Sequence, residues 1–103
     1  MKNVDIHTLL DWMNHNQAEL YDVREPGEWD VAHINGAKLV PLSQFDADKL
    51  TAPEGKKLVV HCKSGGRSSL AAQKLEELKN VEVYNLDGGI DAWMDAGLPT
   101  SRK

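Results

Sequence analysis

Apolar residues at helical spacing alternate along the chain with short apolar runs. The segment 5–15 predicts a helix capped by Asp5, because its apolar residues fall three or four positions apart on one face: Ile6, Leu9, Leu10 and Met13. The segment 68–79 predicts a second helix, with the same kind of spacing at Ala71, Leu75 and Leu78. Shorter helices are expected in three further places: from Pro26 to Val31, between Ser43 and Leu50, and around Ala92, Trp93 and Met94.

Four other apolar runs are short enough to be strands, at 19–23, 38–40, 58–61 and 81–86. The run 58–61 is almost continuously apolar, which is typical of a central parallel strand covered on both faces. Strands that alternate with helices through short loops predict an α/β domain with a mostly parallel sheet. Since no repeat, low-complexity tract or linker interrupts the chain, residues 1–103 are expected to form a single domain.

Cys62 directly follows the central apolar run, at the carboxyl end of a strand, where parallel sheets bind their ligands. Gly65 and Gly66 permit backbone angles at which successive amides converge on one point and form an anion site. The amino end of the following helix and the side chains of Lys63 and Arg67 add positive charge. Each factor favours the thiolate, so we expect the pKa of Cys62 to lie below the free value of about 8.5. Cys62 is therefore the candidate nucleophile.

Four short motifs occur in a fixed order along the chain. The third is Cys-x-x-Gly-x-Arg-Ser, which begins at Cys62 after a hydrophobic strand. The others are Asp-Val-Arg-Glu at 22–25 with Glu28-Trp29, Ala-His-Ile-Asn-Gly-Ala at 32–37, and Gly-Gly-Ile-Asp-Ala-Trp at 88–93 with Gly-Leu-Pro at 97–99. Together they resemble the signature motifs of the rhodanese (thiosulfate sulfurtransferase) domain family, over nearly the whole chain. The resemblance implies a rhodanese-like α/β fold, with a five-stranded, mostly parallel sheet flanked by helices on both faces.

The resemblance also implies a reaction. Cys62 would take the outer sulfur of a donor, thiosulfate or a persulfide, and pass it to cyanide, a small thiol or a protein thiol. The loop amides would stabilise the terminal sulfur of the Cys62 persulfide. Lys63 and Arg67 would attract and orient the dianionic donor. The substrate-binding residues would then be Lys63, Ser64, Gly65, Gly66, Arg67 and Ser68, and no metal ion or organic cofactor is implied.

Two other functions need a similar loop. Cysteine phosphatases and some arsenate reductases place five residues between the cysteine and the arginine, because a tetrahedral oxyanion needs a larger cradle. Only four residues separate Cys62 from Arg67, and this shorter ring suits a single sulfur atom. The second alternative is a persulfide carrier or partner domain that does not use thiosulfate, and the sequence leaves it open because both need the same loop.

Polar residues outside the loop are expected to be structural. Asp22 would end a strand, and Arg24 would pair with Glu28 to fasten the following turn, as structural ion pairs do. His33 would fix a turn by hydrogen bonding. His61 neighbours Cys62 in sequence, but successive side chains of a strand point to opposite faces, so we expect it to lie away from the thiol.

Composition and charge limit the partners and the cellular location to be expected for this chain. The chain has 103 residues, a net charge of −4 and no cluster of Lys and Arg, which argues against a nucleic-acid partner. It has no apolar run of membrane length and no visible export signal, so we expect a cytoplasmic monomer without a membrane partner. With Cys62 as its one cysteine, a persulfide has no internal thiol to resolve it, and the sulfur must leave to another molecule.

Overall fold

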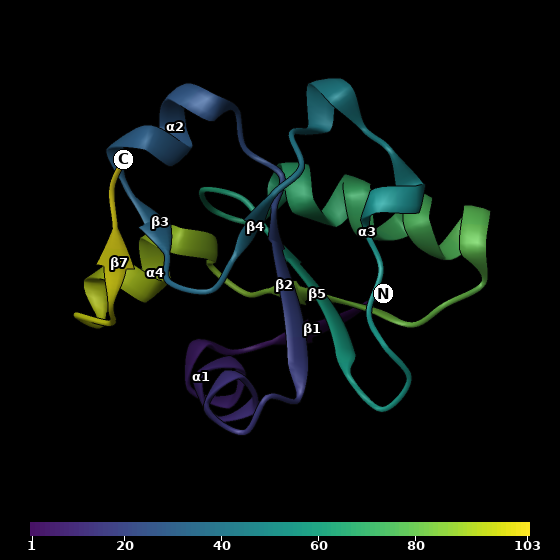
Figure 1. Ribbon diagram of the computed structural model, residues 1–103, viewed down its shortest axis with the longest axis horizontal. Coiled ribbons are helices and arrows are strands. Elements are labelled where there is room, and N and C mark those ends of the chain that lie inside the picture. The colour runs from purple at the N-terminus through teal and green to yellow at the C-terminus, as the bar shows by residue number, and fades with distance from the viewer.

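A five-stranded parallel sheet runs through the middle of the molecule, in the strand order β1-β6-β5-β2-β4 (Figure 1). The computed structural model describes residues 1–103. All neighbouring strands of this sheet pair in parallel, which confirms the expected α/β class. The strands are β1 (Lys2–Val4), β2 (Ala18–Asp22), β4 (Lys38–Leu39), β5 (Lys57–His61) and β6 (Val83–Leu86).

Helices cover both faces of the sheet because side chains alternate along its strands. Leu20 and Val59 point to one face, where they pack with Leu9 of α1 (Ile6–Asn14) and Trp93 of α4 (Gly89–Asp95). The alternate residues of the same strands form a second core under α3 (Gly66–Lys79), together with Leu50. Figure 1 shows α1 and α4 on one side of the strands and α3 on the other. The expected helices on both faces are therefore present.

Both long helices were predicted in place, with corrections at their ends. Asp5 caps α1 as expected, and its carboxylate accepts a hydrogen bond of 2.7 Å from the backbone amide of Thr8. The helix α3 begins at Gly66, two residues earlier than expected, because Gly65 at its N-cap has a φ of +121° and turns the chain directly into the helix. Leu78 does not belong to the buried stripe: it is 62% exposed, and Ala72 takes its place beside Leu75.

The short elements were harder to predict. The helix α2 (Pro26–Val31) forms as expected, with Pro26 in its first turn. Between Ser43 and Leu50 the expected helix is instead two 3₁₀ turns, η1 (Leu42–Gln44) and η2 (Ala47–Lys49). Ser43 lies inside the first turn and is not a cap, since its hydroxyl donates to the Glu25 carboxylate, 2.6 Å away.

Three strands have no counterpart among the sequence predictions. The strand β1 is three residues long and buries one of them, Val4, so it has no visible alternation. The strands β3 (His33–Ile34) and β7 (Thr100–Ser101) form a separate antiparallel ribbon of two residues each. Such runs are too short for a periodic pattern, and only their pairing partners define them.

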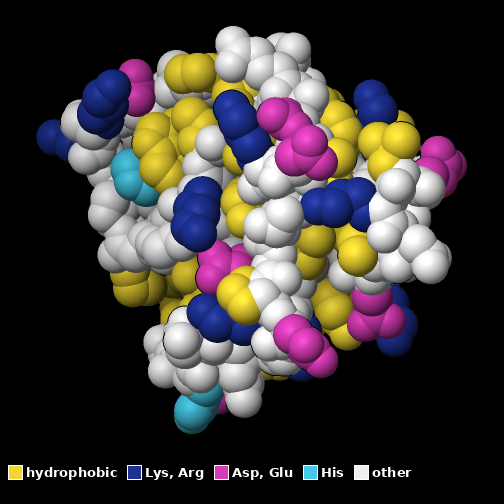
Figure 2. Space-filling model, turned by 45° about the vertical axis from the view of Figure 1, so that its right-hand side comes forward, with side chains coloured by type: hydrophobic (Ala, Val, Ile, Leu, Met, Phe, Trp, Pro, Cys, Tyr) yellow, Lys and Arg dark blue, Asp and Glu magenta, His cyan; other side chains and the backbone are white.

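Charged side chains of both signs are interspersed over the face of the molecule shown in Figure 2. No helix combines the length and the apolar character that a membrane crossing requires.

Candidate active site

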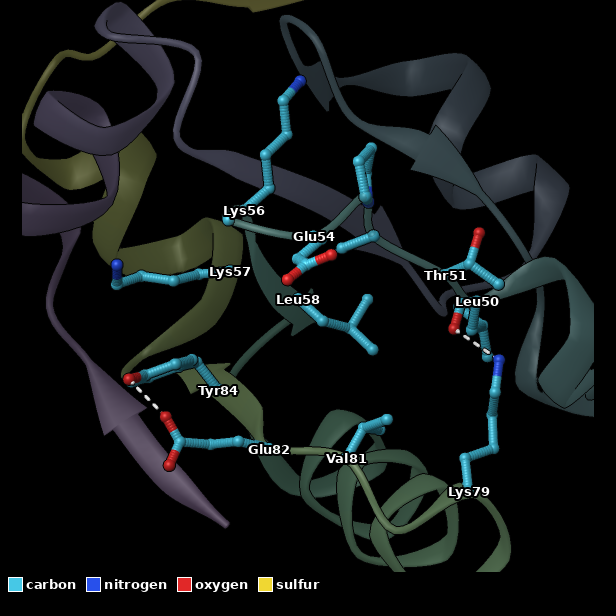
Figure 3. Close-up of a pocket in the computed structure, with 13 residues that line it drawn as sticks. Leu50, Thr51, Glu54, Lys56, Lys57, Leu58, Lys79, Val81, Glu82 and Tyr84 are labelled. Carbon is cyan, nitrogen blue, oxygen red and sulfur yellow. Dashed lines mark hydrogen bonds between the residues drawn. The ribbon is translucent and has the colours of Figure 1, made fainter.

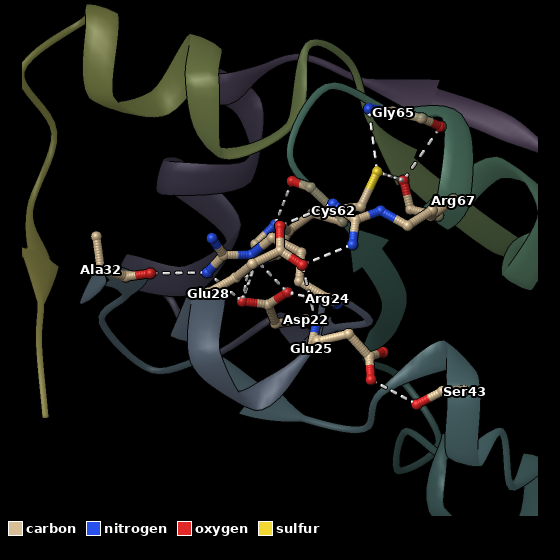
Figure 4. A network of polar contacts seen from close by, with 11 residues as sticks. Asp22, Arg24, Glu25, Glu28, Ala32, Ser43, Cys62, Gly65 and Arg67 are labelled. Atoms are coloured by element: carbon tan, nitrogen blue, oxygen red, sulfur yellow. Dashed lines mark hydrogen bonds and ion pairs between the residues drawn. The ribbon is translucent and has the colours of Figure 1, made fainter. Parts of the chain in front are cut away.

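Strand β5 delivers Cys62 to the carboxyl edge of the sheet, and α3 begins four residues later. The cysteine is a free thiol and is only 1% exposed. Its Sγ accepts a hydrogen bond of 3.1 Å from the backbone amide of Gly65, drawn in Figure 4, and one of 3.3 Å from the hydroxyl of Ser68. The predicted nucleophile therefore sits inside the turn of its own loop, with donors directed at its sulfur.

The first turn of α4 holds the loop from the other side. The backbone amides of Ile90 and Asp91 donate to the carbonyls of Cys62 and Lys63, each at 3.0 Å. The loop carbonyls thus satisfy helix-end amides that would otherwise lack a partner. A Cβ atom on Gly89 would lie 2.4 Å from the Lys63 carbonyl oxygen, so only glycine permits this approach. Gly89 therefore lets the backbone of α4 pass close to the cysteine loop.

Opposing effects act on the thiol. Burial makes the largest single contribution and raises the pKa of Cys62, because a charge loses its hydration there. Hydrogen bonds from the hydroxyl and amide of Ser68 and from the amides of Gly65 and Ser64 together outweigh burial, so the pKa of Cys62 lies below its ordinary value. The predicted direction is confirmed. Its main cause is hydrogen bonding rather than the cationic side chains.

Both cations of the loop have carboxylate partners. The ammonium of Lys63 lies 2.8 Å from Asp91 of α4, and its side chain is 63% exposed. The guanidinium of Arg67 makes two hydrogen bonds, 2.6 and 2.9 Å long, to the carboxylate of Glu28 in α2. The bond from Arg67 is the main reason why the pKa of Glu28 falls to about 2, and Glu28 in turn raises the pKa of Arg67. The predicted cations are at the loop, but their charge is locally balanced.

A second ion pair lies beneath the loop. The Asp22 carboxylate is fully buried and accepts hydrogen bonds from the Arg24 guanidinium, the shortest of them 2.7 Å. Arg24 also donates to the carbonyl of Ala32, which ties β2 to the end of α2. The expected pairing of Arg24 with Glu28 is therefore wrong: a buried carboxylate needs the nearest cation, and Arg24 is two residues from Asp22.

His33 and His61 have the structural contacts expected of them. His61 is fully buried, and its Nδ1 donates to the carbonyl oxygen of Cys62 at 3.0 Å and not to the sulfur. Burial lowers the pKa of His61, because a charged ring would lose its hydration there. His33 bonds the carbonyl of Trp29 at 2.9 Å and stacks on its indole, with ring centres 3.7 Å apart. Each ring fixes backbone near the site.

One buried polar residue was missed in the sequence. Asn85 lies on β6, is 6% exposed, and its Oδ1 accepts a hydrogen bond of 2.5 Å from the hydroxyl of Ser68. Its Nδ2 faces the carbonyl of Gly65 at 3.4 Å. Its amide side chain inside a predicted apolar strand could have pointed to a polar partner at the site, because a buried polar group is normally hydrogen-bonded.

The sequence model of the rhodanese-like domain family matches residues 5–96. The chain belongs to this family.

Known relatives of the rhodanese-like domain agree with this assignment. This chain is 40% identical over 93 residues to the uncharacterized protein slr1261 of Synechocystis, and the match covers 90% of this chain and 52% of slr1261. This chain is also 32% identical over 97 residues to the thiosulfate sulfurtransferase GlpE of Vibrio cholerae, and the match covers 94% of this chain and 92% of GlpE. The crystal structure of a rhodanese-related protein from Thermoplasma volcanium superposes with a TM-score of 0.87 and 26% identity over all of both chains. The chain thus spans about half the length of slr1261 and nearly all of GlpE.

The largest cavity of the rhodanese-like domain lies away from Cys62. It has a volume of about 470 Å³ and includes Lys57 and Leu58 at the amino end of β5, the opposite edge of the sheet (Figure 3). Two of its polar side chains already have partners: the Lys79 ammonium donates to the carbonyl of Leu50, and the Tyr84 hydroxyl donates to the carboxylate of Glu82. Parallel sheets bind ligands at the carboxyl edge, so the loop of Cys62 remains the candidate site.

Proposed function

We propose that this chain is a thiosulfate sulfurtransferase that moves sulfane sulfur through a persulfide on Cys62. The observation that carries the proposal is a buried free thiol whose sulfur accepts hydrogen bonds from Gly65 and Ser68. These donors stabilise negative charge at the sulfur, and they lower the pKa of Cys62 against the effect of burial. Membership of the rhodanese-like family supports the same chemistry.

In the first half-reaction, the Cys62 thiolate attacks the sulfane sulfur of thiosulfate. The sulfur–sulfur bond of the donor breaks, and its electron pair leaves with sulfite. Cys62 is left as a persulfide whose terminal sulfur carries one negative charge. Lys63 and Arg67 can also bind the thiosulfate dianion. A lysine ammonium has three N–H groups and a guanidinium has five, and the bonds to Asp91 and Glu28 use only some of them.

In the second half-reaction, cyanide or a thiolate attacks the terminal sulfur of the persulfide. The bond between this sulfur and the Sγ of Cys62 breaks, and the electron pair returns to Cys62 as thiolate. The acceptor leaves as thiocyanate or as a new persulfide. No further oxidant or reductant is required, because each step is a displacement at sulfur in which one nucleophile enters and one anion leaves with the electron pair of the broken bond.

Intact mass spectrometry tests the proposal. After incubation with thiosulfate, the protein should gain one sulfur atom (about 32 Da) and lose it when cyanide is added. Cys62→Ser should show neither the gain nor any turnover, with an unchanged circular dichroism spectrum as the control for folding. A parent protein that gains no sulfur, or a Cys62→Ser variant that still turns over, would contradict the proposal.

The pairing of both loop cations with carboxylates favours a second candidate, a persulfide carrier that exchanges sulfur with a partner and not with thiosulfate. An approaching dianion meets no unpaired positive side chain at Lys63 or Arg67. In this case the protein should accept sulfur rapidly from a low-molecular-weight persulfide and slowly from thiosulfate. Comparable loading rates from both donors would exclude the carrier.

A further inference from the structure

A groove opens beside the cysteine loop, between α2 and α4. Its volume is about 340 Å³. Lys63, the residue after Cys62, contributes to one wall, and Glu28, the partner of Arg67, contributes to another. Apart from these charged groups and Arg24 and Asp91, the groove is lined by Gly27, Val31, Ala32, Ile90 and Met94.

Two large apolar side chains of this groove are unusually open to solvent. Val31 is 74% exposed, more than any other large apolar residue of the chain, and Met94 is 43% exposed. They come from different helices, α2 and α4, and line the same groove. Exposed apolar residues gathered in a depression mark an interaction site, whereas scattered ones do not. A partner seated in the groove would cover Val31 and Met94 and supply the apolar contacts that they lack.

The charge around the groove selects the kind of partner. The helices α2 and α4 carry four carboxylates and neither a lysine nor an arginine; the four are Glu28, Asp30, Asp91 and Asp95. Lys63 and Arg67 of the neighbouring loop are paired with Asp91 and Glu28. Arg24 of the groove lining is paired with the buried Asp22, so Asp30 and Asp95 are the two carboxylates of these helices that are in no ion pair. A second copy of this chain, with its net charge of −4, would be repelled. A basic segment would be attracted.

We propose that this groove docks the sulfur acceptor, and that the acceptor is a protein segment with an apolar residue beside its reactive cysteine and lysine or arginine on either side. The proposal rests on the function proposed above. The apolar residue would lie between Val31 and Met94, and the basic residues would face the carboxylates of α2 and α4. The groove continues to Lys63, so a cysteine next to the seated residue would reach the loop that holds Cys62.

Docking would serve the second half-reaction. The acceptor thiolate attacks the terminal sulfur of the Cys62 persulfide, and the bond from this sulfur to Sγ breaks. The electron pair stays on Sγ, and the acceptor leaves as a protein persulfide. One thiolate is consumed and one is regenerated, so no other reactant is required. Cyanide needs no groove for this step, because it contacts only the terminal sulfur.

The test compares two acceptors on protein loaded with sulfur from thiosulfate. One is cyanide. The other is a synthetic peptide with one cysteine, a leucine before it and two lysines on either side, and a matched peptide has glutamates in place of the lysines. Two variants alter the groove: Val31→Lys adds a repelling charge, and Gly27→Phe fills the space, since a Cβ there meets no atom within 4 Å. Leu78→Lys, at an apolar residue of α3 that is 62% exposed, is the control outside the groove.

We expect the basic peptide to have a KM at least about tenfold below that of the acidic peptide. Val31→Lys and Gly27→Phe should each raise the KM of the basic peptide about tenfold, the loss of one apolar contact or more. Their turnover with cyanide should stay within about twofold of the parent, and Leu78→Lys should change neither reaction. Equal KM values in the parent and Val31→Lys, or equal use of the two peptides, would overturn the proposal.

A binding measurement separates this proposal from the proposed function. The basic peptide is made with serine in place of cysteine, and it is titrated into unloaded protein while the methyl NMR signals of Val31 and Met94 are followed. Saturable shifts at both residues, lost in Gly27→Phe, support the groove even if no persulfide forms. Absence of such shifts rejects the groove even if Cys62 transfers sulfur to cyanide.

Discussion

The hydroxyl of Ser68 has one proton and three acceptors within reach. Asn85 Oδ1 is nearest at 2.5 Å, the carbonyl of Gly65 lies at 3.2 Å, and Cys62 Sγ lies at 3.3 Å. Because one proton makes one strong hydrogen bond, Asn85 competes with the sulfur for it. A charged sulfur attracts the proton more strongly than a neutral thiol does, so formation of the thiolate is coupled to a rotation of this hydroxyl.

Ser68→Ala should therefore raise the pKa of Cys62, because the largest contribution that favours the thiolate is removed. The reactivity of Cys62 with iodoacetamide at pH 7 should fall by roughly tenfold, which corresponds to about 1.4 kcal/mol for one hydrogen bond to an anion. The pH profile of alkylation should move to higher pH. Ser69→Ala, at the partly buried neighbouring serine, is the control. An unmoved profile in Ser68→Ala would assign the stabilisation to the loop amides alone.

Glu28 links stability to pH. Its pKa falls from 4.5 to about 2 in the folded protein, chiefly because Arg67 donates to it. A carboxylate with a lowered pKa stabilises the fold above its unfolded pKa, and this contribution is lost as the pH falls from 4.5 to about 2. Since the side chain is 33% exposed, solvent screening limits the contribution to roughly 0.5–1 kcal/mol.

Glu28→Gln should thus lower the free energy of unfolding by about this amount at pH 7 and by almost nothing at pH 2. Glutamine keeps the capping position of α2 but does not ionise. Urea denaturation at several pH values measures the difference. Glu77→Gln, on an exposed residue that is in no ion pair, should show no such trend. A gap between parent and Glu28→Gln that persists at pH 2 would mean that the ion pair is not its cause.

At the scale of the elements, α4 makes a close backbone contact with the cysteine loop. Two amides of α4 donate to two loop carbonyls, and Gly89 has a φ of +59° with no room for a side chain. The loop therefore takes its shape from two helices at once, α3 on its carboxyl side and α4 against its carbonyls. The resulting position of the thiol depends on β5, α3 and α4 together.

Gly89→Ala should disturb this contact. Its Cβ would lie 2.4 Å from the carbonyl oxygen of Lys63, so α4 or the loop must move. We expect the free energy of unfolding to fall by about 2 kcal/mol or more, with slower alkylation of Cys62. Gly27→Ala is the matched control, because its Cβ meets open space. Thermal unfolding of both variants measures the effect, and equal melting temperatures would contradict the close approach.

Over the whole molecule, the number of cysteines and their burial would determine the fate of the proposed persulfide. The chain has no thiol other than Cys62. Because Cys62 is only 1% exposed, its sulfur is poorly placed to contact the Cys62 sulfur of another copy. Protein loaded with thiosulfate and then desalted should keep its added sulfur, and it should migrate as a monomer on a non-reducing gel. Addition of a thiol should release the sulfur within minutes. Rapid loss without an acceptor, or a disulfide-linked dimer, would show that the site opens to other molecules of the protein.

Much of the fold could be predicted because its signals are local. The apolar spacing of α1, its cap at Asp5 and the continuous run of β5 each depend on a few neighbouring residues. The elements of two or three residues could not be predicted, since β3 exists only through pairing with β7 at the other end of the chain. The predicted place of Leu78 was wrong for a related reason: helical spacing defines a stripe, but only the neighbouring layer decides how much of it is covered.

The sequence by itself determined that a cysteine follows a buried strand and enters a short glycine loop before a helix, because these features need only adjacent residues. The tertiary structure decided which charged and polar groups meet. Arg67 pairs with Glu28 across 39 positions, Lys63 with Asp91 across 28, and Ser68 with Asn85 across 17. Each choice depends on how helices and strands pack, and no local pattern encodes it. The candidate nucleophile was therefore visible in the sequence, whereas the balance of charge around it required the fold.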